Sequence, residues 1–188
     1  MKKTILLAAV AALLFVKCGK NTDPFIITNN SIGEFTKTMK IKQVDSIFTN
    51  DSIVRLYENQ SAAGTSGEVE IYEKGGSKLL LLSPKNETDP NSEINNIQIF
   101  DARYKTEKGL NSASTFKEVK DNYTVVNIES TINSVVVFLK ETNVYLTIDK
   151  KHLPEELRYN MDAKVETTQI PDTTPFKYFM IGWDSEIE

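Results

Sequence analysis

The chain contains one histidine and one cysteine, which limits the chemistry that its side chains can perform. A structural zinc site needs four Cys or His ligands, and His152 with Cys18 cannot supply them. A serine or cysteine nucleophile normally needs a neighbouring imidazole as its base. We interpret His152 as a solvated loop residue, and we predict no catalytic residue, no metal and no cofactor.

Carboxylates are the remaining candidates for acid–base chemistry. The chain has 26 Asp and Glu residues, so the sequence allows a pair of carboxylates that act as acid and base. Glu155 and Glu156 are adjacent and suit the charged first turn of a helix, starting near Pro154, better than they suit catalysis. The sequence therefore favours a protein that is not an enzyme, with a carboxylate-based hydrolase as an alternative.

Cys18 directly follows a segment typical of export signals. Lys2 and Lys3 precede an apolar run over residues 5–16, as in the charged and apolar regions of a secretory signal. As a helix this run would be about 18 Å long, whereas the core of a bilayer is about 30 Å thick. We therefore predict a signal peptide over residues 1–17.

The box Leu14-Phe15-Val16-Lys17-Cys18 resembles the end of a bacterial lipoprotein signal, although Phe15 and Lys17 depart from its usual residues. In that family the cysteine receives a diacylglycerol thioether and becomes the acylated N-terminus. The resemblance implies lipidation of Cys18, with palmitate-like chains holding the protein at a membrane of the cell envelope. We expect residues 18–30 to form a flexible tether and residues 31–188 to form a single ectodomain.

The charge of the predicted mature chain narrows the range of partners. Removing Lys2, Lys3 and Lys17 leaves 19 basic and 26 acidic residues, a formal charge of −7. Such a surface is repelled by nucleic acid, which we do not expect as a partner.

Two short helices are predicted 75 residues apart. Each helix is predicted from a set of four apolar residues, of which the last three follow the i, i+3, i+7 spacing of one helix face. Thr115 and Glu118 also fit a capping box at the second helix. The matched positions are Phe35, Ile41, Val44 and Phe48 in the first set and Leu110, Phe116, Val119 and Tyr123 in the second.

Each predicted helix is followed by segments with the alternating pattern of antiparallel strands, as at Val144, Leu146 and Ile148. This order predicts an α+β fold of two tandem helix-plus-sheet repeats, over about 31–105 and 106–188. We expect one continuous antiparallel sheet with short helices on one face, and a mobile loop over residues 84–95. The predicted strands cover residues 53–58, 68–74, 78–83, 96–104, 124–129, 134–140, 143–149 and 176–183.

The order of helix and strands resembles the tandem fold of the beta-lactamase inhibitor proteins and of small envelope-assembly lipoproteins. The stretches 33–48 and 109–123 carry this resemblance. The ending, from Ile170-Pro171-Asp172 to Trp183, resembles lipoproteins of Bacteroidota to which no activity is assigned. The resemblances imply an envelope protein, located at the outer membrane.

The aromatic residues of the last predicted strand could serve either the core or recognition. Tyr178, Phe179 and Trp183 are candidates for an interaction surface, although aromatic residues on both faces also fit a buried central strand. Ser52 and Thr173 follow aspartates in a loose O-glycosylation pattern.

Anchoring and the lack of a catalytic motif together favour a non-catalytic binding protein of the envelope. A protein of the envelope is the expected partner, besides the membrane itself. The alternatives are an assembly factor of an outer-membrane complex and the hydrolase mentioned above.

Overall fold

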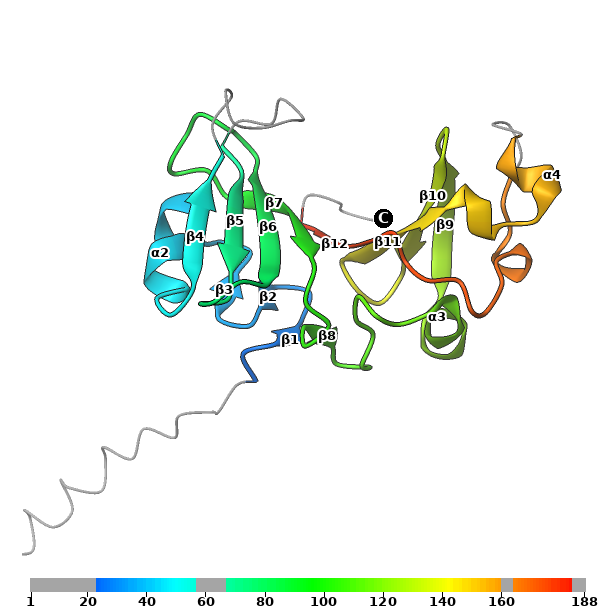
Figure 1. The fold of residues 1–188 in the computed structure, drawn as a ribbon, viewed down its shortest axis with the longest axis horizontal. Helices are drawn as coiled ribbons and strands as arrows, with labels where there is room; N and C mark the ends of the chain where they lie inside the picture. Colours follow the sequence, from blue (N-terminus) through cyan, green and yellow to red (C-terminus); the bar gives the residue numbers. More distant parts are fainter. Residues whose placement is uncertain (1–22, 57–66, 160–163, 184–188) are drawn as a thin grey trace, which may run out of the picture.

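The computed structural model describes residues 23–56, 67–159 and 164–183. Its main feature is an eight-stranded antiparallel sheet in the order β4-β5-β6-β7-β12-β11-β10-β9 (Figure 1). The strands are β4 (Ser52–Arg55), β5 (Val69–Tyr72), β6 (Lys78–Pro84), β7 (Ile94–Ile99), β9 (Val125–Ser130), β10 (Ser134–Leu139), β11 (Val144–Asp149) and β12 (Tyr178–Gly182). The α+β class and the antiparallel sheet are confirmed, and the fold is mostly β because its helices are short.

The two halves of the chain each supply four adjacent strands, and β7 and β12 join them. Ile99 lies opposite Phe179 and Ile97 lies opposite Ile181 across this junction. One row of apolar side chains therefore crosses the whole sheet on its inner face. The row consists of Ile53, Ile71, Leu80, Ile99, Phe179, Leu146, Val137 and Ile128.

Two short helical segments precede the two sets of strands, as the sequence predicts. The first is a 3₁₀ turn, η2 (Ile41–Gln43), that continues into α2 (Val44–Ile47), and the second is α3 (Phe116–Asn122). Ile41 and Val44 of the first, and Phe116 and Val119 of the second, are buried in the core.

Glu118 caps α3 by reaching back to the residue before the helix. The carboxylate of Glu118 accepts two hydrogen bonds from Thr115, one from its backbone N–H at 3.0 Å and one from its side-chain hydroxyl at 2.6 Å. These bonds hold the pKa of Glu118 below its ordinary value. The pairing of Thr115 with Glu118 predicted from the sequence is present.

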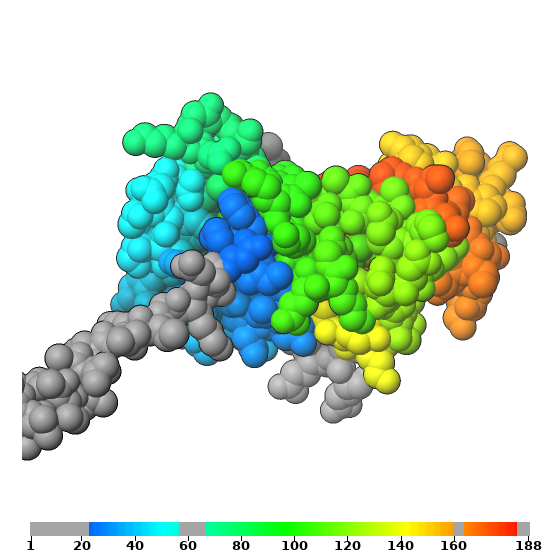
Figure 2. All heavy atoms as spheres, turned by 90° about the horizontal axis from the view of Figure 1, so that it is seen from below, coloured from blue at the N-terminus to red at the C-terminus, as the bar shows by residue number. Residues whose placement is uncertain are grey.

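The structure has a second, four-stranded sheet in the order β3-β2-β1-β8. It includes part of the segment that the sequence predicts to be a flexible tether, so that prediction is wrong from β1 onward. Its strands are β1 (Ile26–Ile27), β2 (Ser31–Ile32), β3 (Phe35–Thr36) and β8 (Lys105–Thr106). In the space-filling view the blue residues of the first strands lie against the green segment that includes β8 (Figure 2). Ile27 pairs with Ile32 and Thr106 and is only 1% exposed, so the described part of the tether folds from β1 onward.

The predicted mobile loop over residues 84–95 is held at its C-terminal end. Ile94 is buried in β7, and the carbonyl oxygen of Ser92 accepts a hydrogen bond from the N–H of Ile41 at 2.9 Å. Lys40 and Glu93 form an ion pair at 2.8 Å. The loop therefore covers the start of η2.

The remaining short helices are η3 (Lys150–His152), α4 (Glu155–Arg158) and η4 (Thr167–Gln169). Pro154 precedes α4, and Glu155 and Glu156 form its acidic first turn, as expected. Within the described ranges, no helix has the length and apolar character needed to span a membrane. The predicted signal peptide and Cys18 lie outside the described residues.

Candidate interaction surface

The outer face of the eight-stranded sheet, here called the open face, carries a second cross-strand row. Every residue of this row is half-buried or exposed, in contrast to the core row on the inner face. An antiparallel sheet commonly leaves one face to solvent in this way. The row consists of Val54, Glu70, Leu81, Gln98, Met180, Tyr145, Phe138 and Asn127.

Aromatic side chains occupy the second half of the open face. The rings of Phe138 and Tyr145 stack with centroids 5.7 Å apart and an interplanar angle of 24°. The hydroxyl of Tyr145 donates to Oδ1 of Asn96 at 2.6 Å, which fixes the ring, and burial raises the pKa of Tyr145. Tyr178 lies two residues before Met180 on the same face and is 43% exposed. This part of the face is therefore apolar, partly fixed and accessible.

A charged cluster occupies the first half of the open face. Nζ of Lys78 lies 2.5 Å from Oε1 of Glu70 and 4.6 Å from the ring centroid of Phe100, which is 39% exposed. The hydroxyl of Tyr72 donates to the other oxygen of Glu70 at 2.7 Å. Burial opposes ionisation of Glu70, but the bonds from Lys78 and Tyr72 prevail and lower the pKa of Glu70.

The structure separates the three residues predicted to form an interaction surface. Tyr178 lies on the open face, whereas Phe179 and Trp183 are 1% and 2% exposed. Phe179 belongs to the core row, and Trp183 stacks on Phe35 with centroids 6.1 Å apart. The surface prediction is therefore wrong for Phe179, which alternation in β12 points inward, and for Trp183, which follows β12 and is buried against Phe35.

Four further aromatic residues lie on the open face and were not predicted from the sequence to do so: Tyr72, Phe100, Phe138 and Tyr145. Phe138 and Tyr145 alternate with Val137 and Leu146, which point to the core. That alternation was the available signal. It indicates which residues share a face but not that two aromatics lie opposite each other.

The two predicted glycosylation positions are both at the surface but in separate places. Ser52 is the first residue of β4, and Thr173 lies in the turn that precedes β12. Both are exposed, so their modification stays a prediction.

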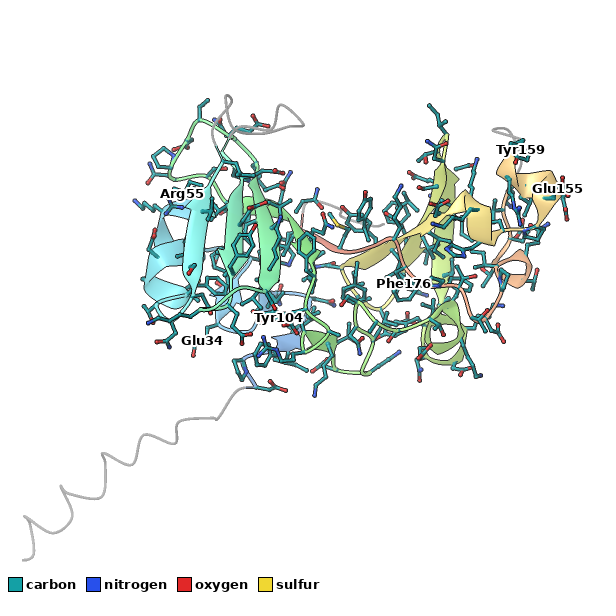
Figure 3. All side chains as sticks on the ribbon, viewed as in Figure 1. Glu34, Arg55, Tyr104, Glu155, Tyr159 and Phe176 are labelled. Atoms are coloured by element: carbon teal, nitrogen blue, oxygen red, sulfur yellow. The ribbon has the colours of Figure 1, made fainter. Side chains whose placement is uncertain are left out.

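One cavity contains carboxylates that could serve the alternative function, a carboxylate-based hydrolase. A cavity of about 240 Å³ is lined by Glu34, Asp51, Glu73 and Tyr104, and Figure 3 labels Glu34 and Tyr104. Burial, followed by the charge of Glu73, raises the pKa of Asp51, and burial raises that of Tyr104 to about 12. Glu73 itself pairs with Arg103 at 2.9 Å. Among the described residues, no group of His, Cys, Asp and Glu is arranged to hold a metal ion.

Comparison with known proteins gives a likeness of fold. No protein-family model matches the chain, and no curated protein matches it. The crystal structure of the uncharacterized protein YfeY from Escherichia coli is similar, with a TM-score of 0.51 and 12% identity. The alignment covers 83% of this chain and 98% of YfeY. At this identity the likeness shows the fold alone.

Proposed function

We propose that the protein is an envelope lipoprotein, anchored through Cys18, that binds another protein with its open face. The observation that carries the proposal is the cross-strand row of eight residues, none of them buried, with Phe138, Tyr145 and Tyr178 at or beside it. Tyrosines with an apolar ring and a polar tip are enriched at protein interfaces.

The geometry of these aromatics favours binding without a large ordering cost. The Phe138–Tyr145 stack and the Tyr145–Asn96 hydrogen bond already restrict two of the rings. A surface that is ordered before binding loses less side-chain entropy when a partner docks. The face therefore has the properties of a preformed contact site.

We further propose that the sheet arose from two tandem repeats, over about residues 31–105 and 106–188. Two observations support this: Ile41 and Phe116 each begin a helical segment 75 residues apart, and four antiparallel strands follow each segment in chain order. Under this interpretation the open face spans the junction of the repeats, where β7 pairs with β12.

In-cell cross-linking of the tagged, anchored protein, followed by affinity purification and mass spectrometry, tests the binding role. We expect one envelope protein to be recovered with the wild type. The double variant Phe138→Ala/Tyr178→Ala should reduce that recovery about tenfold or more, since central aromatic anchors dominate binding energy. Tyr159→Ala is the matched control, because Tyr159 is 84% exposed and lies outside the open face.

Recovery of the same partner by the double variant, or of no partner by the wild type, would contradict the proposal. Near-equal amounts of the protein and one outer-membrane component would favour the assembly-factor alternative. Circular dichroism of both variants checks that the sheet stays folded.

The hydrolase is the second candidate, and it rests on the pocket of Asp51. The raised pKa of Asp51 beside a Glu73 that pairs with Arg103 gives two carboxylates in different environments, as acid–base catalysis requires. A hydrolase would lose turnover in Asp51→Asn, whereas the partner recovered through the open face would be unchanged.

A further inference from the structure

A cluster of cationic side chains surrounds a cavity of about 580 Å³ at the end of the molecule that carries α4. Figures 1 and 3 show α4 and the labelled Tyr159 far from the N-terminal strand β1. Among the residues that the structure describes, four cations and a single carboxylate line the cavity, in a chain whose formal charge is −4. The charged residues are Lys150, Lys151, Arg158, Lys177 and Asp149.

The sheet itself brings these cations together. Lys150 and Lys151 directly follow β11, and Lys177 directly precedes β12. Since β11 and β12 are antiparallel neighbours, the end of one lies beside the start of the other. The N–H of Lys177 donates to the carbonyl oxygen of Thr147 at 2.7 Å, and that of Lys150 donates to Asn133 at 2.9 Å. Hydrogen-bonded backbone therefore holds the positions of the lysines.

Lys150 is the unusual member of the cluster. It is 3% exposed, and among the described residues its Nζ has no hydrogen-bond partner. A buried ammonium without a partner is strongly unfavourable, and lysines are almost never fully buried unless they are paired. Among the described residues, Nζ of Lys150 thus lacks a counter-charge, and Lys150 lines a cavity large enough to contain one.

Asp149, the acidic residue of the cavity, does not supply that counter-charge. Its Oδ1 accepts the N–H of Lys151 at 2.9 Å, and its Oδ2 lies 3.5 Å from Nζ of Lys151. The backbone bond from Lys151, with the charges of Lys151 and Lys177, lowers the pKa of Asp149. Asp149 is therefore paired with Lys151, and the described lining of the cavity carries a net positive charge.

We infer that this cavity binds a phosphate group, whose charge pairs with Lys150. A phosphate carries about two negative charges near neutral pH and several acceptor oxygens, which suits several cations better than one carboxylate would. Lysine is a common phosphate ligand as a point charge. The volume exceeds that of a free phosphate, so the cavity has room for the molecule that bears the ester.

Calorimetry and thermal unfolding of the full chain in detergent test this site with inorganic phosphate and glycerol 1-phosphate. At about 100 times Kd, glycerol 1-phosphate should raise the Tm of the wild type by about 5–10 °C at constant ionic strength. Lys150→Met should abolish that shift and weaken binding about tenfold or more, while Lys74→Met, on the exposed turn after β5, should behave as wild type.

The stability of Lys150→Met without ligand and the phosphate affinity of a second variant provide two further tests. Without ligand, Lys150→Met should be at least as stable as the wild type, because it removes an unpaired buried charge. If that variant does not fold, Lys177→Gln should still weaken binding, since Lys177 is exposed and its loss leaves the core intact. The proposed phosphate site would be wrong if neither phosphate compound changed the Tm and the calorimetric trace of the wild type. It would also be wrong if Lys150→Met bound phosphate as well as the wild type does.

The source of the phosphate follows from a comparison of micelles. Binding that is competed by micelles containing phosphatidylglycerol, but not by those containing phosphatidylcholine, would assign the site to an anionic lipid headgroup. Binding that neither micelle competes would assign it to a soluble phosphate ester. Both results support a phosphate site.

Discussion

Tyr178 and Phe179 are adjacent in β12 but lie on opposite faces of the sheet, so their substitution should have opposite consequences. Phe179 lies in the core row between Ile99 and Leu146. Phe179→Ala should lower the free energy of unfolding by about 3–5 kcal/mol, and Tyr178→Ala by about 0.5 kcal/mol or less. Urea unfolding of both variants measures this difference. Equal losses for the two variants would contradict the assignment of faces.

Glu70 gives the open face a pH dependence of stability. Its pKa is lowered below 4.5 in the folded protein, so it binds protons more weakly there than in the unfolded chain. The resulting stabilisation is present above about pH 4.5 and is lost as the pH falls through the folded pKa. Glu70→Gln should therefore cost about 1 kcal/mol near neutral pH and almost nothing at a pH below the folded pKa of Glu70. Urea unfolding at the two pH values measures the loss of stability caused by Glu70→Gln. If that loss is the same at both, it does not come from the ion pair between Glu70 and Lys78.

At the scale of elements, the sequence predicts long strands well and short ones poorly. Val144, Leu146 and Ile148 alternate over a full strand, and β11 follows with those side chains buried. Both faces of the segment around Phe179 are apolar, so periodicity alone cannot decide which aromatics are exposed. Strands of two residues, such as β1 and β8, have no period at all. Their pairing depends on contacts between residues far apart in the chain, which no local pattern encodes.

The turn between β2 and β3 shows how the small sheet depends on one glycine. Gly33, just after β2, has φ of 55°, and a side chain there would collide with the carbonyl oxygen of Pro24. Gly33→Ala should destabilise the protein by about 1–2 kcal/mol and loosen β1 before the large sheet. Hydrogen exchange at the amide of Ile27 measures the local effect. Gly75→Ala is the control, since its side chain would meet nothing within 4 Å although φ is also positive. Equal protection of Ile27 in both variants would contradict this account.

At the scale of the whole molecule, the small sheet shortens the link between the domain and its predicted anchor. Because β1 begins at Ile26, only residues 19–25 lie between Cys18 and folded strand. A fully extended chain spans at most about 3.6 Å per residue, so these residues reach about 25 Å. A lipidated Cys18 would therefore keep the folded domain, from β1 onward, close to the membrane, where an envelope partner is also within reach.

The proposed lipid anchor predicts how the protein distributes between membrane and solution. Each buried methylene contributes about 0.8 kcal/mol, and two or more acyl chains together hold a protein stably. Cys18→Ala should move the protein from the membrane fraction to the soluble fraction and leave its Tm unchanged, because the core of the described residues begins at Ile27. Asn21→Ala, which keeps the cysteine, is the matched control and should stay with membranes. Fractionation with intact-mass measurement checks both points, since the acyl chains add a defined mass to the mature chain. Membrane association of Cys18→Ala equal to that of the control would contradict the lipid anchor and with it the short distance between the folded domain and the membrane.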